Sequence, residues 1–348
     1  MIRILITEDS EVVSLLLKAI FEHEPDMQVI GRARDGREAV RMVHELKPDL
    51  VTMDIRMPVM DGFEATRMIM STHAVPIVVI SSSVDDEELK ITFRAIEEGA
   101  LAVIEKPRGL SHPDFEVTRL ELVETVRAMA EVKVIRRFAR ERAAEVDIFE
   151  AAIQQRTKAH EVVAVGVSTG GPQALHALLS LLPIGFPLPI VIVQHMSKGF
   201  VGGLVAWLQG NTLLSVTLAA DRQKLAPGTV YFAPDDRHLL VERNQDGLIA
   251  RLSEGPPVNG FRPSATPLLK SVAATCNGRG IGVLLTGMGA DGADGLLAMR
   301  RAGSHTLVQD EASAVVYGMP GTAIAIDAVD QVVRLEQMPS YLVSLARK

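Results

Sequence analysis

Residues 162–172 read VVAVGVSTGGP, a short apolar run that leads into a glycine-rich turn and then a proline. An apolar run of this length is typical of a strand buried on both faces, and proline fits the first turn of a helix. Further strands are expected at 189–194 and 280–286, and a hairpin from residues 228–234 and 238–242. The pattern predicts a doubly wound, mostly parallel α/β domain with a β-hairpin.

A first series of βα units precedes this one. Short apolar runs alternate with segments of helical period, and the last helix is expected from about residue 115. This alternation predicts a doubly wound, five-stranded parallel domain at residues 1–125, followed by a domain at 161–348. The expected strands of the first domain are 2–6, 27–31, 49–53, 76–80 and 101–104.

The segment between the two domains, residues 126–160, is expected to be a helical linker. Residues 132–161 contain neither glycine nor proline, and they alternate basic, acidic and apolar side chains. Glycine and proline are the residues that interrupt helices, so their absence favours a continuous helix.

Composition limits the functions open to the chain. Its 348 residues suffice for about two domains, and 36 basic against 43 acidic residues give a net charge of −7. This balance, with 4% aromatic residues, argues against a nucleic-acid partner. No apolar run approaches the roughly 18 residues of a membrane span, and the start shows no cleavage-like site. With Cys276 as its one cysteine, the protein is expected in the reducing cytoplasm, without membrane insertion.

Polar side chains gather at the ends of the first-domain strands. Glu8 and Asp9 follow the first strand, and Asp54 follows the third. Ligands of open α/β sheets bind outside the carboxyl ends of the strands, and a cluster of carboxylates there suits Mg²⁺. Ser81 ends the fourth strand and Lys106 follows the fifth, where a hydroxyl and an ammonium could bind a phosphoryl group carried on one carboxylate.

Because of these polar residues at the strand ends, residues 1–125 resemble a response-regulator receiver domain, which has a flavodoxin-like fold. The stretch MDIRMPVMDG at 53–62 matches the receiver phosphorylation motif. The resemblance implies that Asp54 is the phosphoacceptor, that it binds Mg²⁺ with the acidic pair, and that the hydroxyl and the lysine bind the phosphoryl group. One departure is that the fifth-strand switch aromatic of many receivers falls on Val103.

A second set of strand-end residues has the chemistry of a serine hydrolase. Residues 166–170, GVSTG, match the G-x-S-x-G turn that exposes a nucleophilic serine, here Ser168, although such a turn can also bind phosphate. A serine needs a base that an acid orients. His195 closes the strand at 189–194, and Asp291 follows the strand at 280–286. Asp291 could also serve as a helix N-cap, a role equally open to Asp294.

The chain order of serine, histidine and aspartate excludes a standard lipase or esterase, because in α/β-hydrolases the acid precedes the histidine. The order and motifs resemble the chemotaxis protein-glutamate methylesterases, the CheB family, over essentially the whole chain. The motifs that carry the resemblance are GVSTGG at 166–171, QHM at 194–196, GPPVN at 255–259, FRPS at 261–264, GMG at 287–289 and DG at 291–292.

The resemblance implies hydrolysis of γ-glutamyl methyl esters on the cytoplasmic helices of methylated chemoreceptors, with release of methanol, and deamidation of glutamines there. Ser168 would attack the ester, His195 would move the proton and Asp291 would orient the imidazole. The backbone amides of Thr169 and Met288 are candidate oxyanion donors.

The same resemblance implies the partners and cofactors. A chemotaxis histidine kinase would supply the phosphoryl group, Mg²⁺ would serve phosphorylation, and the esterase reaction would need no cofactor. Recruitment to membrane-bound receptor arrays is left open. Phe200 and Arg262 are candidate substrate contacts, with packing or an ion pair as the alternative. Many relatives carry proline-rich linkers, so the expected helical linker is a departure.

The sequence is also compatible with two other functions. Gly287, Gly289 and Gly292 spell G-x-G-x-x-G, a dinucleotide-binding fingerprint, with Asp310 18 residues after the last of them. That fingerprint normally occupies the first βα turn of its domain, which here is the serine turn. The chain could instead be a non-enzymatic, receiver-linked binding protein that acts as a phosphate sink.

Overall fold

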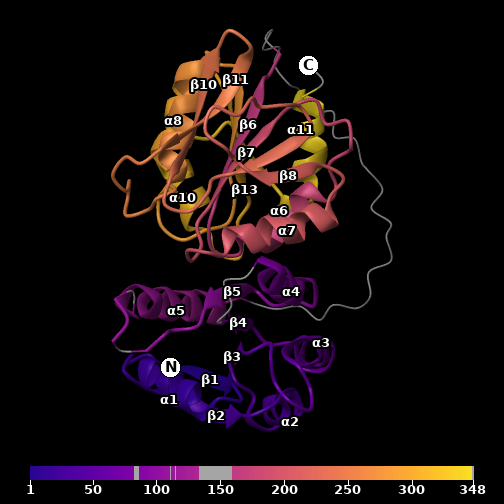
Figure 1. Cartoon of the computed structure of the whole chain (residues 1–348), viewed down its shortest axis with the longest axis vertical. Coiled ribbons are helices and arrows are strands. Elements are labelled where there is room, and N and C mark those ends of the chain that lie inside the picture. The colour runs from indigo at the N-terminus through magenta and orange to yellow at the C-terminus, as the bar shows by residue number, and fades with distance from the viewer. Residues whose placement is uncertain (82–85, 110, 114, 133–158, 347–348) are drawn as a thin grey trace. The chain divides into compact units, whose positions relative to one another are not determined.

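The computed structural model describes residues 1–81, 86–109, 111–113, 115–132 and 159–346 (Figure 1). The chain forms two compact units, Met1–Glu141 and Arg142–Lys348. Most of the expected linker, residues 133–158, lies outside the described residues. Of its described residues, 126–130 are helical, as the last part of a helix that ends at Ala130, and 131–132 and 159–160 are not helical.

The first unit is a five-stranded parallel sheet in the order β2-β1-β3-β4-β5. This is the doubly wound, flavodoxin-like order that the sequence predicts. Helix α1 contacts α5, while α3 contacts α2 and α4, so the helices form two groups that flank the strands (Figure 1). The elements are β1 (Ile2–Thr7), α1 (Glu11–Glu22), β2 (Met27–Ala33), α2 (Gly36–Leu46), β3 (Leu50–Met53), α3 (Gly62–Thr72), β4 (Ile77–Ser81), α4 (Asp86–Glu97), β5 (Ala102–Glu105) and α5 (Phe115–Ala130).

The second unit is built on a seven-stranded parallel sheet in the order β14-β13-β12-β6-β7-β9-β8, with a separate two-stranded hairpin. The predicted α/β class is therefore confirmed for both units. The elements are β6 (Val162–Val167), α6 (Gly171–Leu179), β7 (Ile190–Gln194), α7 (Val201–Asn211), β8 (Ser215–Leu218), β9 (Thr229–Phe232), β10 (His238–Asn244), β11 (Gly247–Ser253), α8 (Ala265–Cys276), β12 (Gly280–Leu284), α9 (Ala293–Arg301), β13 (His305–Gln309), α10 (Gly318–Ala325), β14 (Gln331–Val333), the 3-10 helix η1 (Leu335–Gln337) and α11 (Met338–Ala346).

The hairpin has different strands from those predicted. Strand β9, expected to pair with residues 238–242, instead lies between β7 and β8 in the main sheet and runs parallel to both. Strand β10 pairs antiparallel with β11 through a two-residue connection, Gln245 and Asp246. The three apolar residues 230–232 of β9 are buried, as they must be in a strand inside a parallel sheet. Burial of these residues therefore favoured a place in the main sheet over a hairpin with β10, although β10 follows β9 closely in the sequence.

The hairpin supports helix α8, beside which it lies (Figure 1). Leu239 and Val241 of β10 are fully buried in one hydrophobic core with Leu268 and Val272 of α8. This packing holds the first residues of α8 in place, and the site described below depends on them.

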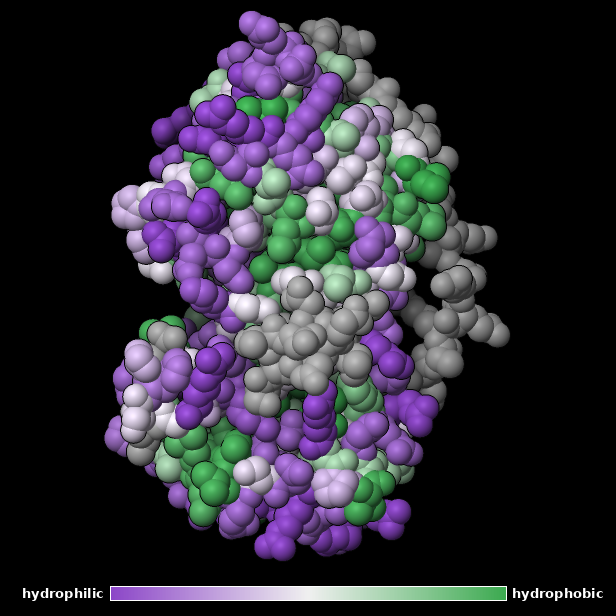
Figure 2. Space-filling view, in the orientation of Figure 1, coloured by the Kyte–Doolittle hydropathy of each residue, from purple (hydrophilic) through white to green (hydrophobic). Residues whose placement is uncertain are grey.

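Hydrophilic residues make up most of the surface on the face seen in Figure 2, and hydrophobic residues gather in smaller areas. Among the described residues, no helix combines the length and the apolar character that a membrane crossing requires.

Candidate active site and phosphorylation site

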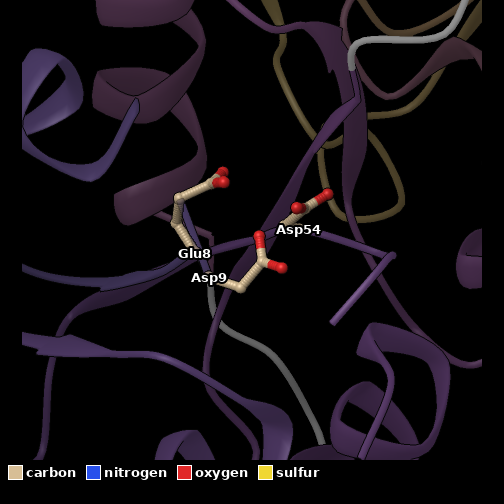
Figure 3. A group of neighbouring side chains, drawn as sticks. All are labelled: Glu8, Asp9 and Asp54. Carbon is tan, nitrogen blue, oxygen red and sulfur yellow. The ribbon is translucent and has the colours of Figure 1, made fainter. Parts of the chain in front are cut away.

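Three carboxylates lie together at the carboxyl edge of the first sheet. Strands β1 and β3 are neighbours, and the amide of Asp54 donates to the carbonyl of Thr7 at 2.9 Å, so the residues after the two strands meet. One oxygen from each of Glu8, Asp9 and Asp54 lies within 4.8 Å of the others. Figure 3 shows the three carboxylates turned toward the same space. Ser10, not Asp9, caps α1, so Asp9 is not used as a helix cap.

Lys106 reaches this cluster from the end of β5. Its Nζ lies 2.8 Å from Glu8 Oε2 and 3.1 Å from Asp54 Oδ2. Burial and the neighbouring Asp54 charge raise the pKa of Glu8, although Lys106 opposes them. Burial alone would lower the pKa of Lys106, but the two carboxylates raise it, so the amine is a cation at neutral pH.

The donor set of this cluster fits a hard divalent cation. Glu8 and Asp54 are buried and Asp9 is exposed, and the single positive charge of Lys106 offsets only part of the repulsion among three carboxylates. Oxygen ligands from few carboxylates, with room for water and phosphate oxygens, are what Mg²⁺ prefers. Ser81 lies nearby, because the amide of Lys106 donates to its carbonyl at 2.7 Å.

The second site also lies at neighbouring strand ends. Strands β12, β6 and β7 are adjacent in the sheet. The amide of Ser168 donates to the Thr286 carbonyl, just beyond β12, and the amide of His195 donates to the Val167 carbonyl, both at 3.0 Å. The topology therefore brings the residues after these strands to one edge of the sheet.

Asp291 is buried at the N-terminus of α8. Its Oδ2 accepts the amide of Ala265 at 2.6 Å, and its Oδ1 accepts the hydroxyls of Ser264 at 2.6 Å and Thr266 at 2.7 Å. The Asn259 side-chain amide donates to Oδ1 at 3.3 Å. The amides at a helix N-terminus carry partial positive charge, so they stabilise a carboxylate. Asp291 is therefore not the N-cap of α9; that position is Gly292, and Asp294 lies in the first turn.

These contacts keep Asp291 ionised. Burial on its own would raise the pKa of the carboxyl, but His195 and the hydroxyls of Ser264 and Thr266 lower it, and the net result is a pKa well below the ordinary value. A buried, negatively charged Asp291 is suited to stabilise a positive imidazolium beside it.

His195 lies next to this carboxylate. Its Nε2 is 2.9 Å from Asp291 Oδ2, and its side chain is 6% exposed. The distance is that of a hydrogen bond, but the angle is not, because neither ring nitrogen has an aligned partner among the described residues. Catalytic hydrogen bonds are often poorly aligned in the free enzyme and become aligned when substrate binds.

The turn around Ser168 is shaped by buried polar side chains for which the sequence predicts no role. Gln194 Nε2 donates to the carbonyls of Ser168 at 2.9 Å and His195 at 2.7 Å. Thr286 Oγ1 donates to the carbonyl of Thr169 at 2.9 Å. Gln194 and Thr286 could have been recognised in the sequence, because each is a polar residue at or just beyond the end of an apolar strand. Ser264, which supports Asp291, could have been recognised as a helix N-cap before an apolar segment.

The candidate oxyanion donors flank this turn. The amides of Ser168 and Gly287 donate to backbone carbonyls of Thr286 and Val316. In the described part of the chain, the next amides, those of Thr169 and Met288, have no main-chain acceptor outside helices and strands. They therefore stay the candidate donors to a developing oxyanion.

Phe200 and Arg262 have structural contacts. Phe200 is only 1% exposed, which favours the packing role over a substrate contact. Arg262 Nη1 lies at hydrogen-bonding distance of the carbonyls of Glu254, at 3.4 Å, and Gly255, at 3.3 Å, and so fastens its own loop.

The glycines of the dinucleotide-like pattern are needed for packing. A Cβ on Gly287 would lie 2.7 Å from Ser168 Cβ, and one on Gly292 would lie 2.5 Å from Leu284 Cδ2. Two of the three glycines are thus explained by contacts within the chain, and they leave little reason to assign the pattern to a nucleotide.

Comparison with known proteins agrees with this geometry. Residues 163–342 match the family model described as CheB methylesterase, and residues 4–112 match the response regulator receiver domain. The chain is 46% identical to a protein-glutamate methylesterase/protein-glutamine glutaminase of Geobacter metallireducens over 99% of both chains. A Myxococcus xanthus protein with the same description is also 46% identical, over 99% of this chain and 97% of that one. The crystal structure of the Thermotoga maritima CheB methylesterase catalytic domain matches 54% of this chain and all of that domain, with a TM-score of 0.53 and 34% identity.

Proposed function

Because the chain belongs to the CheB methylesterase family and carries a response regulator receiver domain, we propose that it hydrolyses γ-glutamyl methyl esters of methylated chemoreceptors under the control of phosphorylation. Deamidation of receptor glutamines is proposed for the same site. The observation that carries the proposal is the meeting of Ser168, His195 and Asp291 at one edge of the second sheet, with a buried carboxylate beside the imidazole.

The proposed reaction has two halves, in which Ser168 is the nucleophile. Its Oγ attacks the ester carbonyl carbon, and His195 takes the hydroxyl proton through Nδ1, the ring nitrogen that does not face Asp291. The tetrahedral intermediate places its negative oxygen near the amides of Thr169 and Met288. Collapse expels methanol, which receives the proton from His195, and leaves an acyl-serine.

The second half repeats the chemistry with water. His195 takes a proton from the water that attacks the acyl carbon, and it returns that proton to Ser168 as the glutamate carboxylate leaves. Asp291 stays ionised and stabilises the imidazolium in both halves, which its place at the N-terminus of α8 permits. With a glutamine side chain the leaving group is ammonia, and the same residues act.

Phosphorylation is proposed at Asp54, with a chemotaxis histidine kinase as the phosphodonor. Mg²⁺ bound by Glu8, Asp9 and Asp54 would supply the positive charge that offsets the carboxylates and the phosphoryl oxygens. Lys106 donates to the oxygens of the phosphoryl group from its position between Glu8 and Asp54, and the Ser81 hydroxyl is proposed to do so from the next strand end. The proposed place of action is the cytoplasmic side of receptor arrays, where the receptor helices present their esters.

Methanol release from a methylated receptor cytoplasmic fragment tests the proposed function. With a small-molecule phosphodonor and Mg²⁺, release by the full chain should rise about 5- to 150-fold, the usual range of coupling between two sites. The Asp54→Asn variant should keep basal release and lose the stimulation, because the amide cannot form an acyl phosphate. Glu45→Gln, an exposed change on α2, is the matched control. Stimulation that survives in Asp54→Asn would contradict the assignment of the phosphoacceptor.

A Gly287→Ala substitution is expected to lower kcat for ester hydrolysis by about 100-fold, since small misplacements of a nucleophile have effects of this size. The new methyl group would lie 2.5 Å from Met319 Sδ and 2.7 Å from Ser168 Cβ, so the serine must move. Gly185→Ala is the control, because a Cβ there meets nothing within 4 Å. Steady-state methanol release measures both variants, and an unchanged kcat in Gly287→Ala would show that this contact does not position Ser168.

A further inference from the structure

A two-residue turn carries side chains to both the histidine and the aspartate of the second site. Val258 and Phe261 exchange two main-chain hydrogen bonds of 3.0 Å, and Asn259 and Gly260 between them have φ values of 54° and 83°. Positive φ at both central residues is the type I′ turn, for which Asn-Gly is the favoured sequence. The turn is therefore a hydrogen-bonded local structure that its own sequence favours.

The two sides of this turn contact different catalytic groups. The Phe261 ring stacks on the His195 imidazole, with centroids 4.0 Å apart and planes 4° from parallel. The Asn259 amide donates to Asp291 Oδ1 at 3.3 Å. No residue of the turn makes or breaks a bond in the proposed reaction, yet the turn contacts both the base and the acid.

The stack with Phe261 is a ring contact of His195 that the structure shows directly. Neither ring nitrogen has an aligned hydrogen-bond partner among the residues that the structure describes, although Asp291 Oδ2 lies 2.9 Å from Nε2. A ring without such a bond can turn about its side-chain torsions unless packing prevents it. The nearly parallel Phe261 ring covers one face of the imidazole and restricts that rotation.

The loop that bears Phe261 is held in place by hydrogen bonds from His238 and Arg262. His238 of β10 is 3% exposed, its Nε2 lies 3.0 Å from the Pro256 carbonyl, and its Nδ1 accepts the amide of Ser264 at 3.2 Å. This arrangement fixes the tautomer of His238, with the proton on Nε2. Arg262 adds its contacts to the carbonyls of Glu254 and Gly255.

We infer that Phe261 is a positioning residue for His195: it holds the imidazole plane so that one nitrogen faces Asp291 and the other is free to take the serine proton. The inference rests on the proposed function and deepens it. Orientation of a catalytic base changes the rate of proton transfer more than it changes substrate binding, so the effect should fall on kcat. The aromatic face also favours the imidazolium that forms in the transition state.

The test compares three variants of the full chain. Phe261→Leu keeps the apolar volume but removes the flat ring, and it should lower kcat by about 10- to 100-fold with KM within about twofold of the wild type. Phe261→Tyr keeps the ring and should restore kcat to within about threefold. Leu213→Ala, a 64% exposed apolar residue of the same unit, is the control and should change neither constant.

A second readout does not depend on activity. In protein labelled at histidine, the stacked ring of Phe261 shields the His195 ring protons, so their NMR signals should move downfield in Phe261→Leu and stay in place in Phe261→Tyr. Comparison with a His195→Gln sample identifies these signals among those of the nine histidines.

Three results separate the inference from the proposed function. An unchanged kcat in Phe261→Leu, or a raised KM with an unchanged kcat, overturns the positioning role. Unmoved His195 signals in Phe261→Leu overturn the stack itself. If the wild type releases no methanol, the proposed function fails, and the NMR comparison alone then decides whether Phe261 orients His195.

Discussion

The Ser168→Ala variant is expected to lower kcat for methyl-ester hydrolysis by about 10⁶-fold, as loss of the nucleophile does in other serine hydrolases. The change should leave the fold intact, with a loss of about 1 kcal/mol or less of unfolding free energy. The main-chain contacts of residue 168 do not involve the hydroxyl, since its amide donates to Thr286 and its carbonyl accepts from Gly171 and Gln194. The loss should therefore be one of chemistry and not of structure.

Methanol release from a methylated receptor fragment, with and without phosphodonor, measures this effect. Ser180→Ala, at the C-cap of α6, is the matched control and should retain full activity. Near-normal turnover by Ser168→Ala would exclude the covalent mechanism. An inactive wild type that still takes up a phosphoryl group would instead favour the receiver-linked binding protein.

The Asp291→Asn variant is expected to lower kcat by about 10⁴-fold, the effect of the equivalent change in serine proteases. An amide has one oxygen where the carboxylate has two, and it carries no charge to stabilise the His195 imidazolium. The same change removes an acceptor from the N-terminus of α8, where Asp291 binds the amide of Ala265 and the hydroxyls of Ser264 and Thr266. We therefore expect the variant also to lose about 1–3 kcal/mol of unfolding free energy, the cost of leaving buried donors without acceptors.

The stability lost in Asp291→Asn should become smaller as the pH falls. The pKa of Asp291 is lowered by folding, so its contribution to stability is fully present above the ordinary carboxyl value of 3.8 and is lost as the pH falls through the folded-state pKa. Urea unfolding should show a constant difference between wild type and Asp291→Asn from pH 7 down to about 5, and a shrinking difference below about 4.

Asp246→Asn, an exposed change in the turn of the β10–β11 hairpin, is the control for both readouts. It should alter neither kcat nor the pH dependence of stability. If Asp291→Asn kept wild-type stability at every pH, the carboxylate would not be anchoring α8.

Sequence periodicity was sufficient to predict the positions of the strands that carry the two sites. The five strands predicted for the first unit, and the three that precede Ser168, His195 and the Asp291 loop, lie within two residues of the observed ones. Buried parallel strands are continuous apolar runs, and such runs are visible in a sequence without any knowledge of their neighbours. The candidate residues could be chosen because the carboxyl ends of parallel strands share one edge of the sheet.

The contacts of those residues could not be predicted in the same way. The expected hairpin was wrong because strand pairing depends on which edge of the sheet is vacant, and β9 joined β7 while β10 paired with β11. Of the expected helical linker at 126–160, residues 126–130 are helical and residues 131–132 and 159–160 are not, and its remaining residues stay a prediction.

The sequence by itself determined the fold class, the strand ends and the residue types that stand there, since local patterns of burial and turn formation decide all three. Only the tertiary structure decided that Asp291 lies at the N-terminus of α8 and that Phe261 covers His195. Those contacts join residues 26 and 66 positions apart in the chain. They arise because the β10–β11 hairpin packs on α8, and the loop between them, held by His238, is thereby brought over the strand ends.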